Sequence, residues 1–329
     1  MSMKINPSKT VGDFKRGTGL LVIEVRNSNP NGDPDRESDP RQRPDRRGEI
    51  SPVSYKRKLR DLVETASSSG SDEQFWVEFS ARFHPALAKG RFQILESRGR
   101  PDRGAITMQL TGDGKAFKDA YWDGRVFGNT FLESMKDDEA KKLFKGDEEA
   151  KKKQIKEFKS NAIKTGVVHF GLGLSVAPID IERHTNTNKA GVESDKDRGM
   201  APMAYRFVPH GVYVMPFFVN PSAAGKTGCT GEDIALMLEL IQYAYAHTRS
   251  HARPAVDLVK AWYVEHSDKL GSCSDFAVLD ALTPKKLADP DSPSKGIHEY
   301  YVPPDLPDEL KSKKDRNGNP ALTLIDLLA

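Results

Sequence analysis

The chain contains little cysteine and few apolar residues for its length. Only Cys229 and Cys273 occur in 329 residues, and neither lies near a cluster of histidines or further cysteines. This pattern argues against a disulfide framework and a structural zinc site, and it is typical of the reducing cytosol. Apolar residues make up 37% of the chain and charged residues 29%. Such a composition favours long polar segments around a modest core.

Long apolar runs are also missing. A membrane-spanning helix needs about eighteen or more consecutive apolar residues, and no such run occurs. The N-terminal segment, MSMKINPSKTVGDFKRG, has no apolar core of the kind found in signal peptides. We therefore expect a soluble, cytoplasmic protein with no membrane partner. The net charge is only +3, so an interpretation as a nucleic-acid-binding protein depends on where the cations are placed.

The common motifs of nucleotide binding and catalysis are absent. AAGKTG at 223–228 lacks the glycine that a phosphate-binding loop carries five residues earlier, because Asn220 occupies that position. GLG at 171–173 lacks the third glycine of a dinucleotide-binding fingerprint. The histidines do not have the spacing of a metal site, and no Ser/His/Asp order stands out. The sequence therefore predicts no cofactor, no metal site and no catalytic activity.

The polar stretch RNSNPNGDPDRESDP, residues 26–40, comes close to the spacing of a calcium-binding loop. Its first and twelfth positions are Asn27 and Ser38, so both terminal carboxylates are absent, and a strand rather than a helix precedes it. Nearby acids could hold magnesium for phosphodiester cleavage, but charges paired with each other in a solvated loop are the simpler interpretation. These acids are Asp33, Asp35, Glu37, Asp39 and Asp45, with arginines at 36, 41, 43, 46 and 47.

The apolar pattern predicts an α+β fold. Strands are expected over 19–27, 167–179, 205–219 and 258–266, and helices over 52–65, 115–136 and 230–247, with a solvated lysine-rich helix within 141–164. Ser51 followed by Pro52 is typical of a helix start, and Thr230 with Asp233 has the spacing of a capping box. The order of these segments matches the split βαβ, or ferredoxin-like, arrangement.

The same pattern divides the chain into regions. The excursions at 67–114 and 182–204 interrupt the expected sheet, and the second one is polar throughout, as in a protruding hairpin. The tail after 283 is rich in Pro, Asp and Lys, and we expect a loosely attached arm whose last turn docks. We call the part of the chain that forms the expected sheet and its two helices the palm. The expected regions are an N-terminal segment 1–17, a first part of the palm 18–66, an inserted subdomain 67–114, a second part of the palm with a lysine-rich excursion 115–181, a hairpin 182–204, a third part of the palm 205–282 and a C-terminal arm 283–329.

Several cations are placed where they could contact phosphates. Arg26 ends a predicted strand, Lys56, Arg57 and Arg60 share one side of a predicted helix, and Arg98, Arg100 and Arg103 lie in turns. Each cation alone is more often an ordinary surface residue. Their placement around a ferredoxin-like sheet, a common platform for single-stranded RNA, indicates RNA binding. The aromatic RNP1 pattern is absent, so base stacking on the sheet face is not predicted.

Several blocks of the sequence resemble those of a known family. NSNPNGDPD at 27–35 and GEISPVSYKRKLRDLV at 48–63 are similar to the opening of the Cas7 family, the backbone subunits of type I CRISPR Cascade complexes, with subtype I-C nearest. Later blocks follow in the same order, namely YWDGRVFG at 121–128, VVHFGLGLSVAPI at 167–179, HGVYV at 210–214 and HTRSHAR at 247–253. Together they cover most of residues 18–270.

The resemblance implies a hand-shaped protein with a ferredoxin-like (RRM-like) palm, inserted fingers or web at 67–114, and a hairpin thumb at 182–204. Members of the family polymerise head to tail along CRISPR RNA, and each thumb displaces a base. The RNA-binding residues that it implies here, with Met200 and Met203 as apolar wedges, are Arg26, Asn27, Lys56, Arg57, Arg60, Arg98, Arg103, His169, Arg183, His184, Arg198, Met200, Met203, Arg249 and Arg253.

The resemblance also implies partners. They are CRISPR RNA, the target DNA strand through pairing with the guide, further copies of the chain, and the other Cascade subunits, which are the 5′-handle-binding, large and small subunits. A filament needs a head-to-tail interface that does not close. We expect the polar stretch after the first strand to supply part of it, through Asn31, Asp33, Asp35, Arg36 and Arg41.

Two other functions stay open at this point. One is a metal-dependent ribonuclease like the related type III backbone subunits, which cut RNA with a thumb aspartate; Asp195 or Asp197 would be that residue here. The other is a stand-alone RNA chaperone, which would be monomeric. The sequence favours a non-catalytic RNA-binding scaffold, in which base pairing reads the target.

Overall fold

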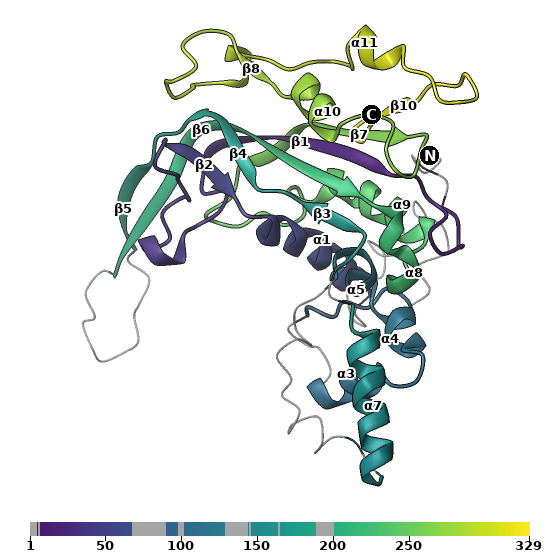
Figure 1. Cartoon of the computed structure of the whole chain (residues 1–329). Helices are drawn as coiled ribbons and strands as arrows, with labels where there is room; N and C mark the ends of the chain where they lie inside the picture. The colour runs from purple at the N-terminus through teal and green to yellow at the C-terminus, as the bar shows by residue number, and fades with distance from the viewer. Residues whose placement is uncertain are drawn as a thin grey trace, which may run out of the picture.

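The computed structural model describes residues 5, 7–67, 90–97, 102–128, 144, 146–163, 165–188 and 201–329, and for 65–67, 103, 186–188 and 201–204 it describes the backbone alone. The fold is mixed α/β and is organised around one antiparallel sheet (Figure 1). Among the helices of these residues, none combines the length and the apolar character that a membrane crossing requires.

The sheet has eight strands in the described part of the chain. Their order is β10-β7-β1-β6-β4-β2, and β3 and β5 also pair with β6. The bounds are β1 Gly17–Ser28, β2 Arg47–Ile50, β3 Val168–Phe170, β4 Gly173–Pro178, β5 Glu182–Asn188, β6 Ala201–Val219, β7 Val256–His266 and β10 Leu322–Asp326. The four predicted strands are all present, although the one expected over 167–179 is split into β3 and β4.

Strand β1 is the central strand, as its apolar sequence predicts. It pairs with β6 from Gly17↔Val219 to Ser28↔Val208 and with β7 on its other side. Successive side chains alternate between the two faces of a strand. Leu21 and Ile23 therefore pack in the main core with the helices, whereas Val22 packs in a separate cluster on the other face.

Two helices cover the first of these faces, which we call the inner face (Figure 1). α1 Pro52–Ser67 places Tyr55, Leu59 and Leu62 in the core, and its first turn is capped because Ser54 N–H donates to Ser51 Oγ at 3.2 Å. α9 Gly231–Leu240 begins with the predicted capping box of Thr230, followed by the 3-10 turn η3 Ile241–Tyr243. The local capping signals of both helices are thus confirmed.

A helical extension stands below the sheet in Figure 1 and has its own small core. It contains α3 Arg103–Met108, α4 Lys115–Ala120, α5 Trp122–Phe127 and α7 Glu148–Asn161. The predicted single helix over 115–136 is wrong within 115–128. Tyr121 is extended (φ −101°, ψ 104°) and bridges to Gln93, which separates α4 from α5. α7 exposes most of its lysines and buries Phe158, as a solvated helix does.

The C-terminal arm covers the opposite, outer face of the sheet (Figure 1). α10 Asp275–Leu282 precedes the arm and packs beside it. The elements of the arm are β8 Lys285–Lys286, the 3-10 turn η4 Ile297–Glu299, β9 Tyr300–Tyr301, α11 Asp308–Lys311 and the edge strand β10. Leu282, Leu306 and Leu310 pack against Trp262 and Val264 of β7. The expectation of a loosely attached arm is wrong, because apolar side chains on the outer face of β7 need a cover. The expectation that its end docks is confirmed, because β10 pairs with β7.

An antiparallel ribbon projects from one edge of the sheet (Figure 1). It consists of β5 and the first part of β6, paired from Glu182↔Phe207 to Asn188↔Ala201. It falls in the region expected to form a hairpin. Residues 189–200 of that region lie outside the described part of the chain.

Candidate nucleic-acid interface

Arg26 stands at the end of β1 with its charge only partly neutralised. Its guanidinium donates to both oxygens of Glu24, from Nε at 2.9 Å and from Nη2 at 2.7 Å. The Arg26 side chain remains 62% exposed, and among the described residues nothing bonds to its Nη1. Burial acts to raise the pKa of Glu24, but hydrogen bonds from Arg26 and His210 outweigh it and hold that pKa below its usual value. The pair keeps one guanidinium edge open to a phosphate.

The chain turns sharply directly after Arg26. Asn27 has φ +41°, a left-handed conformation that Asn tolerates better than most residues. The turn at 247–253 lies against this end of β1, because Asn29 N–H donates to the Ala252 carbonyl at 2.8 Å and Arg253 Nε donates to the Asn29 carbonyl at 3.1 Å. The structure thus brings Arg26, Asn27 and Arg253 together, with the exposed Arg249 in the same turn.

A small recess of about 190 Å³ opens beside Asn27. Its walls include Tyr205 and Phe207 of β6, together with His251. The Tyr205 hydroxyl is hydrogen-bonded to His251, and the two rings meet edge to face with centroids 4.8 Å apart. Tyr205 and His251 were missed by sequence reasoning, although His251 lies within the block HTRSHAR that carries part of the resemblance.

Ion pairs fasten the polar loop after β1 to the projecting ribbon. Asp39 pairs with Arg183 of β5, and Glu37 pairs with Arg206 of β6. The hydrogen bond from Arg183 holds the pKa of Asp39 below its usual value, against the opposing effect of burial. His184 is exposed, its Nε2 lies 3.2 Å from Glu182 Oε2, and its ring meets the Phe207 ring edge to face. Arg183 and His184 therefore lie on the ribbon near its base.

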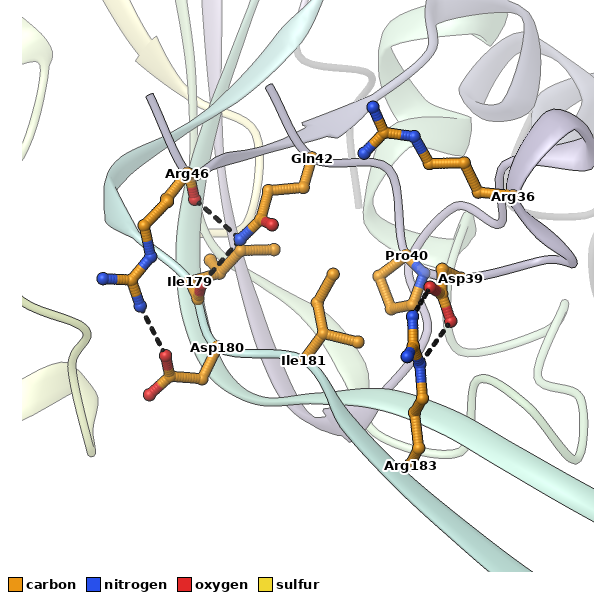
Figure 2. Close-up of a pocket in the computed structure, with 9 residues that line it drawn as sticks. All are labelled: Arg36, Asp39, Pro40, Gln42, Arg46, Ile179, Asp180, Ile181 and Arg183. Carbon is orange, nitrogen blue, oxygen red and sulfur yellow. Dashed lines mark hydrogen bonds and ion pairs between the residues drawn. The ribbon is translucent and has the colours of Figure 1, made fainter. Parts of the chain in front are cut away.

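A larger pocket of about 440 Å³ is lined by residues of this loop and of the base of the ribbon (Figure 2). Pro40, Ile179 and Ile181 supply its apolar lining, and Arg36, Arg46 and Arg183 supply its cations. Arg46 is paired with Asp180 at 2.7 Å. In Figure 2, no interaction is drawn from the Arg36 guanidinium to the other lining residues.

The predicted subunit-interface residues have two kinds of environment. Asn31 Oδ1 accepts from Ser51 N–H at 2.8 Å, and Asp33 caps the 3-10 turn η1 Pro34–Arg36. Arg41 is partly buried. These three residues shape the loop itself, whereas Asp35 and Arg36 are exposed and could meet another chain.

The basic residues of α1 are mostly committed to partners within the chain. Arg57 donates to Asp61 at 2.6 Å and to the Glu96 carbonyl. Arg60 is only 6% exposed, and its Nε donates to Asp123 at 2.9 Å. This leaves Arg60 little surface to offer a phosphate.

Lys56 and His169 form a second, smaller group on the inner side. Lys56 is half-buried, with Nζ 5.4 Å from the centroid of the Phe127 ring. Burial, and then the nearby charge of Arg60, lower the pKa of Lys56. His169 lies at the surface, where partial desolvation of its ring, and then the charge of Lys56, lower its pKa. Because Arg26 points to the outer face of the sheet and α1 covers the inner face, the predicted RNA-binding set is divided.

Lys58 was missed by sequence reasoning and connects α1 to the turn at 247–253. Its Nζ donates to Thr248 Oγ1 at 2.9 Å and lies 5.0 Å from the centroid of the Tyr245 ring. Burial, followed by the charge of Arg253, lowers the pKa of Lys58 to about 8. No feature of the local sequence separates Lys58 from its basic neighbours.

Several predicted residues fall in segments outside the described part of the chain. Arg98, Arg198 and Met200 lie outside the described residues, as do Asp195 and Asp197, and only the backbone is described at Arg103 and Met203. In the part of the chain that the structure covers, no three His, Cys, Asp or Glu side chains are grouped as a metal site would require.

Comparison with known proteins gives one family. The family model described as CRISPR-associated protein Cas7 matches residues 15–305. No curated protein matches the chain.

Solved structures similar to the chain include three CRISPR complexes. A "CRISPR RNA-guided surveillance complex" chain is 13% identical, with 77% of this chain and 70% of that chain covered and a TM-score of 0.40. A "CRISPR RNA-guided surveillance complex, pre-nicking" chain is 14% identical, with 77% and 79% covered and a TM-score of 0.43. A chain of "Type III-B Cmr-beta bound to cognate target RNA" is 12% identical, with 77% and 62% covered and a TM-score of 0.37. Since the family match spans well over half of its residues, the chain belongs to the Cas7 family of CRISPR-associated proteins.

Proposed function

We propose that this protein is a non-catalytic backbone subunit of a type I CRISPR Cascade effector, nearest to subtype I-C. It polymerises along CRISPR RNA and presents the guide for pairing with target DNA. The observation that carries the proposal is the family match over residues 15–305. The exposed arginines at the end of β1 and on the ribbon, Arg26, Arg249 and Arg183, support it, because sequence-independent binding of RNA uses Arg and Lys contacts to phosphates.

The palm in this proposal is ferredoxin-like. Its elements in chain order are β1, α1, β4, β6, α9 and β7, and the four strands lie side by side as β7-β1-β6-β4. This succession of strands and helices is the split βαβ unit. β5 with the start of β6 is then the thumb, and the helical extension belongs to the inserted fingers or web.

Guide RNA in this proposal runs past the end of β1. Arg26, Asn27, Arg249 and Arg253 contact its backbone there, and Arg183 and His184 contact it from the ribbon. Lys56 and His169 are contacts on the inner side. Arg57 and Arg60 support the site by fixing α1, since both are engaged with acids of the same chain.

Further copies of the chain and the other Cascade subunits are the protein partners. Asp35 and Arg36 are the interface candidates with the most accessible side chains. Each copy covers only a few phosphates, so affinity accumulates along the guide and a small net charge per copy is sufficient. The setting is the cytoplasm.

Co-expression with a CRISPR RNA tests the proposal. We expect a large assembly in size-exclusion chromatography, with CRISPR RNA in the extracted nucleic acid, and its reduction to small species after ribonuclease treatment. A monomer with no bound RNA would contradict the proposal. A monomer that binds RNA would favour the chaperone function instead.

Absence of catalysis is a separate part of the proposal. Incubation of the assembly with complementary RNA and Mg²⁺ should leave the RNA intact. Cleavage that disappears in Asp195→Ala or Asp197→Ala would instead establish a ribonuclease.

A further inference from the structure

A chain of hydrogen bonds connects the C-terminal arm to Arg26. It begins at Tyr300 and Ser294 of the arm, passes through His210 of β6, and reaches Glu24, the partner of Arg26 on β1. Tyr300, Ser294, His210 and Glu24 are all buried. The arm is thereby connected to a side chain of the proposed RNA site.

The distances are those of ordinary hydrogen bonds. Tyr300 O–H donates to Ser294 Oγ at 2.8 Å, and Ser294 Oγ lies 2.7 Å from His210 Nδ1. On the other side of the ring, His210 Nε2 lies 3.2 Å from Glu24 Oε1. Oε1 and Oε2 of Glu24 then accept from Nε and Nη2 of Arg26.

All the hydrogen bonds of this series can be donated in one direction, from Tyr300 toward Glu24. Because Tyr300 supplies the hydrogen between it and Ser294, the Ser294 hydroxyl is free to donate to His210 Nδ1. Nε2 then carries the ring proton and donates to the Glu24 carboxylate. This arrangement needs a neutral imidazole, and burial lowers the pKa of His210 in spite of its bond to Glu24. The hydroxyl of Ser294 in the arm therefore favours the tautomer of His210 that is protonated at Nε2 and donates to Glu24.

The position of Ser294 depends on how the arm packs. Tyr300 is 7% exposed and lies in an apolar cluster with Val22, Ala177 and Val212 of the outer face. Without Ser294, no residue that the structure describes would donate to His210 Nδ1, and the ring could adopt the other tautomer or turn away from Glu24. Glu24 would then hold Arg26 in a less defined orientation.

We propose that the C-terminal arm belongs to the RNA site: Ser294 and His210 are positioning residues that fix Glu24, so that Arg26 presents one guanidinium edge to an RNA phosphate. This inference rests on the proposed function, in which Arg26 contacts the guide. Immobilising a flexible side chain on binding costs free energy, and orienting it beforehand avoids that cost.

The test measures binding of the full-length chain to a fluorescently labelled single-stranded RNA by anisotropy, at several salt concentrations. Ser294→Ala should weaken binding about three- to tenfold, with no change in the salt slope, since the Arg26 charge remains. Arg26→Ala should weaken binding and reduce the salt slope by about one. Ser294→Ala added to Arg26→Ala should cause no further loss, because the positioning effect acts only through Arg26.

Two further variants separate positioning from folding. Ser294→Thr keeps the hydroxyl and should restore most of the affinity. Ser312→Ala removes an exposed arm hydroxyl that bonds only to the Glu309 carbonyl among the described residues, and it should bind like the wild type. Thermal melting of each variant shows whether the arm stays folded.

The remaining outcomes overturn the inference. If the wild type binds no RNA, the proposed function fails and the inference fails with it. If Arg26→Ala binds like the wild type, Arg26 is not an RNA contact and there is nothing to position. If Arg26→Ala weakens binding but Ser294→Ala does not, or weakens it equally in both backgrounds, only the inference fails and the proposed function stands.

Discussion

The inner side of α1 and the end of β1 both carry several cations, but different partners hold them. On α1, Arg60 is buried against Asp123, and Arg125 nearby is fully buried against Asp233. At the end of β1, Arg26 has a bidentate partner and still keeps most of its surface exposed. A buried arginine paired with a buried acid serves the fold, whereas an exposed one with a free edge can serve a ligand. The following predictions, from the largest expected effect to the smallest, test this distinction.

Removal of Arg125 should have the largest effect on stability. Its guanidinium donates to Asp233 at 2.7 and 3.0 Å and to the Lys118 and Arg91 carbonyls at 2.7 and 2.9 Å. Arg125→Met leaves Asp233 buried without its main partner and should lower the free energy of unfolding by about 3–5 kcal/mol. Urea unfolding measures this loss. Arg249→Ala is the matched surface control and should change it by less than about 0.5 kcal/mol.

Lys58 should make a pH-dependent contribution of intermediate size to the free energy of unfolding. Its pKa in the fold is about 8, against 10.5 for an ordinary lysine. Between these values the unfolded chain binds the proton and the folded chain does not, so this group makes stability rise with pH. Below about pH 8 the buried charge is fully destabilising. Lys58→Met should therefore be more stable at pH 7, by about 1–3 kcal/mol.

The measurement for Lys58 is a comparison of two proteins. Unfolding of wild type and Lys58→Met at several pH values gives a difference free of titrations that both share. The stability advantage of the variant should shrink between about pH 8 and 10. An advantage that stays constant over this range would show that the lysine charge is not the cause.

Exposed cations should affect RNA binding more than the stability of the fold. We expect Arg26→Ala and Arg249→Ala each to weaken RNA binding by about tenfold. Arg249→Ala should leave urea unfolding unchanged within about 0.5 kcal/mol, whereas Arg26→Ala should also lower stability, because the buried Glu24 loses its bidentate partner. Arg60→Met should lower the free energy of unfolding and leave RNA binding unchanged. If Arg60→Met weakened RNA binding with unchanged stability, the distinction between the two groups of cations would be wrong.

The ion pair between the polar loop and the ribbon should have the smallest effect. Asp39 is buried, but Arg183 is 67% exposed at its side chain, so solvent screens the pair and we expect it to contribute about 1 kcal/mol or less. Asp39→Asn should increase hydrogen exchange of β5 amides with little change in global unfolding. Because the pKa of Asp39 is lowered, the contribution is present above the ordinary value of 3.8 and is lost as pH falls through the folded value. Unchanged β5 exchange in this variant would show that the pair does not hold the ribbon.

Local signals predicted the central strand and the helix starts. The apolar run before Arg26, the Ser51-Pro52 start and the Thr230 box depend on residues close in sequence, so each appears where it was expected. The fate of the cations depends on distant residues. Arg60 meets Asp123 across 63 positions and Arg125 meets Asp233 across 108, which no local pattern shows.

The arm was predicted, but the close packing of its middle part was missed for a similar reason. Leu306 and Leu310 stand among Pro, Asp, Glu and Lys, so they give no helical or alternating pattern. They are buried because β7 offers Trp262 and Val264 on its outer face. The role proposed for Ser294 likewise depends on His210, 84 positions away.

The central position of β1 also has a consequence for how the protein is made. Both strands that flank β1 come from the last half of the chain, with Gly17 opposite Val219 on one side and Glu265 on the other. At about 5–20 residues per second, a ribosome needs on the order of 10–40 s between completing β1 and completing β6. During that time an apolar strand has no partner, and such segments are prone to aggregate. Newly made chains should therefore depend on chaperones early, before either neighbour of β1 has been synthesised.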